Sequence, residues 1–360
     1  MSYRSDHEHS TQVLSRWIDA RDHKAITRHV LGASERSRKA KIPVDSAVRT
    51  VLELYGSGKR KVGAPAAVHP IRVARRLRLM GTLSPVSLVA ALGHDLIEDK
   101  SIGFPEVQGL HDQDMQRVQD LMALLTRGER EPYFDYIKRV AADDAALLIK
   151  LVDRLDNTYD LRISSDPGQT DPELVYKELF RRAVLDDLDH GPHGQHPDKV
   201  PIRSSRRLFD LFKSIVLVHF VRHRGPLPPK IEAAVRKLVT TGIAEAELTA
   251  LHVLQFHDYP GLARNVTTEL VSYGDRFWRV TSSTVRPVSP LDGLFQAFDA
   301  RLSKQDDSAL DALQDDLARM LMGALSMAVI LTRFDLDPSF KGIAGVDDRG
   351  VRSVPPGSPP

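Results

Sequence analysis

The chain has 360 residues and a formal net charge of +2, with 50 Lys and Arg residues against 48 Asp and Glu residues. A charge this close to neutral gives no long basic face of the kind that binds nucleic acid, so we expect no nucleic-acid partner. The chain contains no cysteine, which excludes disulfide bonds, cysteine metal ligands and cysteine nucleophiles.

Apolar residues recur at spacings of three and four along most of the chain, which is the period of an amphipathic helix. The expected helices are 11–30, 44–55, 70–80, 85–98, 105–125, 133–142, 145–162, 172–188, 203–221, 229–240, 245–255 and 308–334. Ser84 followed by Pro85 predicts a helix start, because serine caps the helix and proline suits its first turn. Residues 189–201 predict an exposed loop and residues 277–288 are a candidate strand. We therefore expect an all-α fold.

The sequence predicts neither a signal peptide nor a membrane-spanning segment. The N-terminal residues are polar and lack the apolar stretch of a signal peptide. The longest apolar candidate, Met320 to Leu331, is too short to span a bilayer and lies on an expected amphipathic helix. We therefore expect a soluble, cytoplasmic protein with no membrane partner.

Three polar segments stand out against the apolar pattern. They are Arg60–Pro65 with the following His69-Pro70, then His94-Asp95 with Glu98-Asp99, and finally Lys150–Asn157. Charged groups in an apolar helix are costly to bury unless they are paired or bound to a metal. Imidazole and carboxylate together suit a divalent transition ion, and a second acidic pair one turn later could serve as a general base.

None of the three segments is decisive alone. A single buried aspartate such as Asp153 is usually an ion-paired structural residue, and a histidine before proline, as at His69, is usually a helix cap or a surface residue. The dipeptide His-Asp is also common by chance. Their joint occurrence in this order is more specific.

Together, the segments resemble the hydrolase domain of RelA/SpoT-type enzymes and of stand-alone small alarmone hydrolases. The pattern of that family runs R-x-x-G-x-P, HP, HD-x-x-ED and K-L-A-D-R-L-x-N. The matching residues are Arg60, Gly63, Pro65, His69, Pro70, His94, Asp95, Glu98, Asp99, Lys150, Leu151, Asp153, Arg154, Leu155 and Asn157. The resemblance covers roughly residues 44–162.

The resemblance implies a metal-dependent HD-type phosphohydrolase. One Mn²⁺ ion, or another divalent transition metal, would be bound by His69, His94, Asp95 and Asp153. The attacking water would be activated and positioned by Glu98 and Asp99. The nucleotide would be contacted by Arg60 at the base, Lys61 near the phosphates and Asn157 at the ribose. The implied reaction removes the 3′-pyrophosphate from a small-molecule substrate, the guanosine alarmone (p)ppGpp.

On this interpretation the chain has three parts. Residues 1–200 would form a helical HD-domain bundle together with N-terminal helices, and residues 201–340 a further helical region of unknown role. Residues 341–360 have a composition that cannot bury a core, which predicts a disordered tail.

Departures from the family pattern lie around the expected ligands and not among them. They are Ala66, Ala67, Gly93, Lys100 and Val152. They leave two alternatives open: an HD-type phosphohydrolase for another nucleotide, and a catalytically idle HD-fold module with a regulatory or binding role. The intact ligand set and acidic pair argue against the idle module, which has no chemical need for all six residues.

Overall fold

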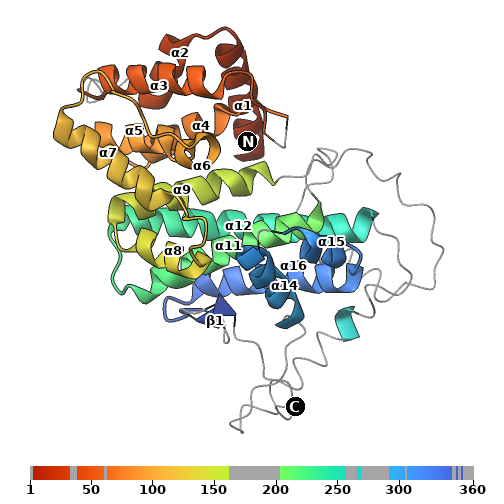
Figure 1. Ribbon diagram of the computed structural model, residues 1–360. Helices are drawn as coiled ribbons and strands as arrows, with labels where there is room; N and C mark the ends of the chain where they lie inside the picture. Colours follow the sequence, from red (N-terminus) through yellow and green to blue (C-terminus); the bar gives the residue numbers. More distant parts are fainter. Residues whose placement is uncertain are drawn as a thin grey trace. The chain divides into compact units, whose positions relative to one another are not determined.

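The computed structural model describes residues 3–32, 39–60, 63–161, 203–256, 264, 266–268, 292–304, 306–342, 346–347 and 350–351. The regular elements of these residues are helices apart from one pair of two-residue strands, which confirms the all-α prediction (Figure 1). The expected helix 172–188, the expected loop 189–201 and the candidate strand 277–288 lie outside the described residues, as does the predicted domain boundary at residue 200.

The chain divides into two compact units. Unit 1 comprises Met1–Asp160 and Arg224–Leu238, and unit 2 comprises Leu161–His223 and Val239–Pro360. The helices of unit 1 are α1 (Tyr3–Asp19), α2 (His23–Leu31), α3 (Lys41–Tyr55), α4 (Val68–Leu79), α5 (Pro85–Gly93), α6 (Leu96–Lys100), α7 (Asp112–Leu125), α8 (Tyr133–Ala141) and α9 (Asp144–Asp160). The long helix α12 (Pro229–Phe256) contributes residues to both units.

Helix α5 forms the centre of unit 1. It packs against α3, α4, α7 and α9, and every residue from Leu88 to Gly93 is buried. Its start agrees with the prediction, because the Ser84 hydroxyl accepts a hydrogen bond from the backbone N–H of Ser87 at 3.4 Å. The predicted single helix 85–98 is interrupted, since α5 ends at Gly93 and α6 begins at Leu96.

Unit 2 is a second helical body. Besides α12 it contains α11 (Ser204–His223), α14 (Asp292–Lys304), α15 (Ser308–Gln314), α16 (Leu317–Leu336), β1 (Val346–Asp347) and β2 (Gly350–Val351). Helix α11 packs against α15 and α16, and the Phe212 ring stacks on Phe295 with centroids 5.3 Å apart. Within the expected tail, β1 pairs with β2 in antiparallel fashion, and residues 352–360 lie outside the described residues.

Helix α16 is longer than the apolar stretch noted in the sequence. Among the described residues it is the one helix whose 20-residue length and composition would allow it to cross a membrane. Of its most apolar window, 56% is buried inside the protein. Core helices of soluble proteins pass the same test, so this property alone assigns no location.

Unit 1 contains a half-buried histidine with a perturbed pKa. The ring of His29, on α2, lies edge-on to that of Trp17 with centroids 5.5 Å apart. Its Nε2 atom is buried without a hydrogen-bond partner. Burial, followed by the positive charge of Arg75, lowers the pKa of His29 from 6.5 to about 4.

We therefore expect His29 to destabilise unit 1 in mild acid. The depressed pKa means that its contribution to stability is complete above pH 6.5 and is lost as the pH falls toward about 4. The His29→Gln variant should lose less unfolding free energy than the wild type across that window. Urea unfolding at several pH values measures this difference, and parallel pH profiles of the two proteins would contradict the prediction.

Candidate metal centre

The four predicted metal ligands come from three separate places in unit 1. His69 lies in the first turn of α4, where the missing N–H of Pro70 costs nothing because first-turn N–H groups have no intrahelical partner. His94 and Asp95 occupy the break between α5 and α6, and Asp153 lies within α9. We call these four residues the HD cluster.

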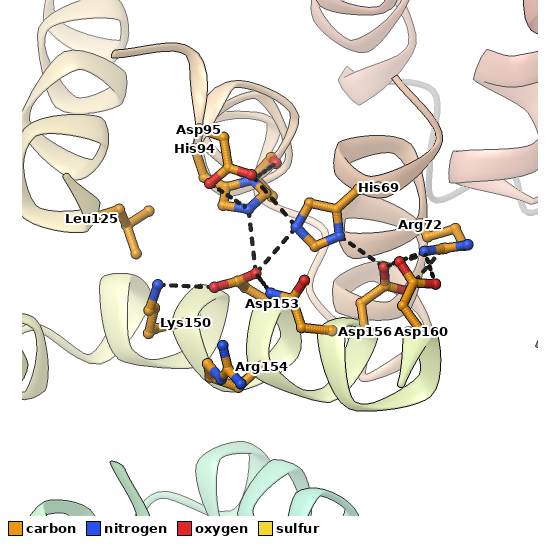
Figure 2. Close-up of polar contacts among 12 residues, drawn as sticks. His69, Arg72, His94, Asp95, Leu125, Lys150, Asp153, Arg154, Asp156 and Asp160 are labelled. Carbon is orange, nitrogen blue, oxygen red and sulfur yellow. Dashed lines mark hydrogen bonds and ion pairs between the residues drawn. The ribbon is translucent and has the colours of Figure 1, made fainter. Parts of the chain in front are cut away.

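The side chains of the HD cluster converge, as Figure 2 shows. His69 Nε2 lies 3.5 Å from Asp95 Oδ2 and 3.1 Å from Asp153 Oδ1. His94 Nε2 lies 3.2 Å from Asp95 Oδ1 and 3.6 Å from Asp153 Oδ1. Both histidines thus direct their Nε2 atoms at the carboxylates of Asp95 and Asp153.

The donor set of the cluster fits a divalent metal. One donor atom each from His69, His94 and Asp95 lies within 4.8 Å of the others. The Nδ1 atom of His94 faces the Ala91 carbonyl at 2.9 Å, whereas its buried Nε2 has no hydrogen bond of good geometry. Two imidazole nitrogens with two carboxylates are ligands that divalent transition ions accept. The cluster is therefore compatible with a divalent cation.

The electrostatics of the cluster also favour a cation. Burial alone would lower the pKa of His94, but the negative charges of Asp95 and Asp153 raise it to about 9. Without a metal, the cluster therefore holds a proton. Metal binding must displace that proton, because a coordinating imidazole is neutral.

Asp153 is held in place by two neighbours on its own helix. Lys150 Nζ lies 2.9 Å from Asp153 Oδ2, and the Asn157 amide donates a hydrogen bond to Oδ1 at 2.6 Å. The Lys150 side chain is only 16% exposed, and the attraction of Asp153 outweighs burial and raises the pKa of Lys150 well above its usual range. Lys150 matched the motif, but the sequence assigned it no role.

Two further residues of the centre escaped the sequence analysis. Asp156 contacts the second ring nitrogen of His69, and Arg72 contacts Asp156. The only signal was spacing, since Arg72 follows His69 by three residues and Asp156 follows Asp153 by three. Residues three apart share a helix face, but the sequence does not show that these two faces meet.

The predicted catalytic pair lies one turn beyond Asp95. The backbone N–H of Asp99 donates to the Asp95 carbonyl at 2.8 Å, and Asp99 Oδ2 accepts from the Tyr55 hydroxyl at 3.2 Å. Burial, followed by the charge of Asp95, raises the pKa of Asp99. Glu98 is exposed and accepts a hydrogen bond from the backbone N–H of Arg127 at 2.9 Å. The catalytic roles of the pair remain predictions.

The predicted substrate-binding residues are brought together only in part. The Arg60 guanidinium donates to Asn157 Oδ1 at 3.0 Å and pairs with Asp160 Oδ2 at 3.1 Å. Its loop is closed by a hydrogen bond from the Gly63 N–H to the Arg60 carbonyl, and Gly63 has a φ of 84° that favours glycine. Arg60 therefore lies beside Asn157, one hydrogen bond from the HD cluster. Lys61 lies outside the described residues.

Gly93, the departure from the family pattern that directly precedes His94, has a structural explanation. A Cβ atom at this position would lie 2.2 Å from Phe104 Cε2 and 3.2 Å from Met122 Cε. The Phe104 ring, which is 4% exposed, fills the space that a larger residue would need. The absence of a side chain at Gly93 therefore leaves the space in the core that the Phe104 ring fills.

We expect the Gly93→Ala variant to lose about 1–3 kcal/mol of unfolding free energy, the usual cost of overpacking a core. The double variant Gly93→Ala, Phe104→Leu should recover part of this loss, because the smaller side chain makes room. Thermal unfolding of the wild type, the single variant and the double variant tests whether the two positions pack against each other. A single variant as stable as the wild type would show that the Phe104 ring moves aside freely.

Comparison with known proteins identifies the family. The guanosine-3′,5′-bis(diphosphate) 3′-pyrophosphohydrolase MESH1 of Drosophila melanogaster is 30% identical over 135 residues, which are 34% of this chain and 71% of that protein. The chain belongs to this pyrophosphohydrolase family. The resemblance found in the motifs is confirmed.

Two larger relatives of the pyrophosphohydrolase family match in the same way. A guanosine-3′,5′-bis(diphosphate) 3′-pyrophosphohydrolase of Aquifex aeolicus is 32% identical over 126 residues, and a probable one of Synechocystis is 26% identical over 136 residues. The match spans 33% and 36% of this chain but only 18% of each relative. No family model and no solved structure matches the chain.

Proposed function

We propose that the chain hydrolyses the 3′-pyrophosphate of guanosine (p)ppGpp-type alarmones with a single Mn²⁺ ion bound by the HD cluster. The observation that carries the proposal is the convergence of His69 and His94 on the same two carboxylates. Membership of the pyrophosphohydrolase family supports the substrate, since the relatives are named for guanosine-3′,5′-bis(diphosphate).

The residues around the cluster have distinct parts in this reaction. A divalent cation held by the HD cluster would polarise a phosphoryl oxygen and make a water molecule more acidic. Asp99 is our candidate base, because its raised pKa lets it take a proton from the attacking water. The bond that forms joins the water oxygen to the 3′-phosphorus, and the bond that breaks releases the 3′-oxygen, which takes up a proton.

Substrate position is assigned to the side of the cluster where Arg60 and Asn157 meet. Their hydrogen bond of 3.0 Å places a guanidinium directly beside an amide that also contacts Asp153. A guanidinium can stack on a base or bind phosphate oxygens in a bidentate manner. In this proposal Glu98, whose carboxylate accepts a hydrogen bond from the N–H of Arg127, orients the attacking water.

The test is release of pyrophosphate from ppGpp by the purified full chain after removal of metals, with and without added Mn²⁺. We expect turnover only with Mn²⁺, with GDP and pyrophosphate formed in equal amounts. If stoichiometric Mn²⁺ binding is seen without turnover, the substrate assignment is wrong and the metal centre stands. If no metal binds, both parts of the proposal are wrong.

Two finer assignments accompany this proposal. We infer that residues 1–200 act as the hydrolase domain, followed by a separate helical region and tail, and that the protein acts in the cytoplasm. The first inference is supported by the HD cluster and its neighbours, which all lie before residue 161. Activity of a chain that ends at residue 200 would test it directly.

A further inference from the structure

Helices α4 and α9 face each other through polar residues that repeat with the same spacing. On α4 these are His69, Arg72 and Arg76, and on α9 they are Asp153, Asp156 and Asp160. Intervals of three and four residues place each set on a single helix face. His69 contacts Asp153 and Asp156, and Arg72 contacts Asp156 and Asp160 (Figure 2). Arg76 also contacts Asp156, and we call this set of contacts between α4 and α9 the ladder.

His69 uses both of its ring nitrogens in this ladder. Its Nε2 atom faces the carboxylates of the HD cluster, and its Nδ1 atom lies 2.8 Å from Asp156 Oδ2. The His69 side chain is 2% exposed and that of Asp156 is 0% exposed. Water therefore cannot replace the carboxylate as the partner of Nδ1.

The carboxylate of Asp156 is itself fixed from the opposite side. Arg72 contacts both of its oxygens, with Nε at 3.0 Å from Oδ1 and the terminal nitrogen at 2.8 Å from Oδ2. Arg76 Nε adds a contact to Oδ1 at 3.0 Å. Arg72 is anchored in turn by Asp160 and by the Thr11 hydroxyl, each at 2.7 Å. Asp156 thus has no freedom to turn away from His69.

We propose that Asp156, held by Arg72, is a positioning residue that directs the Nε2 lone pair of His69 at the metal. A neutral imidazole carries one N–H, and donating it from Nδ1 to Asp156 leaves the lone pair on Nε2. Carboxylates behind metal-bound histidines fix the ring and increase its basicity in this way. The inference rests on the proposed metal centre, and it assigns a role to the unspecified position in K-L-A-D-R-L-x-N.

The test compares two variants of the same helix. Asp156→Asn keeps the shape of the side chain and removes its charge. Asp160→Asn does the same one turn later, where the carboxylate contacts Arg72 and Arg60 but not His69. We measure the Kd for Mn²⁺ alone by titration calorimetry on the full chain. We expect Asp156→Asn to weaken Mn²⁺ binding about 10–100-fold, the usual effect of losing such a partner, and Asp160→Asn to leave the Kd unchanged.

The outcomes separate this inference from the proposed function. A Kd unchanged in both variants, even with a lower Tm, would show that Asp156 is only structural and would overturn the inference. Weaker Mn²⁺ binding by Asp156→Asn supports the inference even if ppGpp is not a substrate. A wild-type chain that binds no Mn²⁺ overturns the inference and the proposed metal centre together.

A second measurement uses the wild type and does not depend on the variant folding. Nitrogen-15 spectra of the histidine rings, recorded with Zn²⁺ as a diamagnetic substitute, report which ring nitrogen carries the proton. We expect a slowly exchanging proton on Nδ1 of His69 and coordination through Nε2. Coordination through Nδ1, or a proton on Nε2, would overturn the inference.

Discussion

The Asp153→Asn variant is expected to lose Mn²⁺-dependent pyrophosphate release by about 10²–10³-fold or more, the range seen when a group that supports transition-state charge is removed. Asp153 Oδ1 lies 3.1 Å and 3.6 Å from the Nε2 atoms of His69 and His94. An amide keeps the volume but supplies a far weaker metal ligand. Initial rates with ppGpp over a range of Mn²⁺ concentrations measure the loss.

The control for this prediction uses the partner of Asp153. Loss of the carboxylate leaves the mostly buried Lys150 ammonium without its partner at 2.9 Å, so the single variant should also be less stable. The double variant Asp153→Asn, Lys150→Met removes both charges and should regain stability without regaining activity. Near wild-type hydrolysis by either protein would remove Asp153 from the metal centre.

The Arg72→Met variant is expected to lose about 3–5 kcal/mol of unfolding free energy, the cost of removing one partner from a buried ion pair. The Arg72 side chain is 2% exposed and faces Asp156 and Asp160, which are 0% and 8% exposed. Methionine fills much of the same volume but leaves these carboxylates with less compensating charge. The attraction of Arg72 also helps to hold the pKa of Asp156 well below its usual range against burial.

Urea unfolding followed by Trp17 fluorescence measures this loss in unit 1. The chain has two tryptophans, so a Trp278→Phe background makes Trp17 the sole reporter. The matched control is Arg49→Met, which breaks the pair with Asp45 at a side chain that is 54% exposed. Such surface pairs contribute about 0–1 kcal/mol. Equal effects of the two substitutions would show that the ladder contributes little to stability.

Helical content could be predicted from the sequence because apolar spacing continues through each helix, but the interruptions could not. The spacing runs on from 85 to 98, yet the chain leaves the helix at His94 and Asp95 and resumes at Leu96. Conversely, the expected helices 229–240 and 245–255 form one helix, α12. Breaks of this kind depend on tertiary packing, which local periodicity does not encode.

The same limit applies to the candidate site. The four candidate ligands could be named because their motifs occur together in order, and the structure brings these side chains close together. The partners that hold them could not, because the bond between His69 and Asp156 joins positions 87 residues apart. Each of those residues alone is an ordinary charged side chain on a helix, and its role depends on which helix it faces.

The pairing of Lys150 with Asp153 has a consequence for the order in which ligands arrive. Asp95 and Asp153 bring two negative charges to the cluster, and Lys150, 2.9 Å from Asp153, offsets one of them. The proton on His94 offsets the other, so the metal-free centre carries no net charge. A divalent cation displaces that proton and leaves the centre positive, which attracts a polyanionic nucleotide. Binding would then be ordered, with the cation binding before the nucleotide.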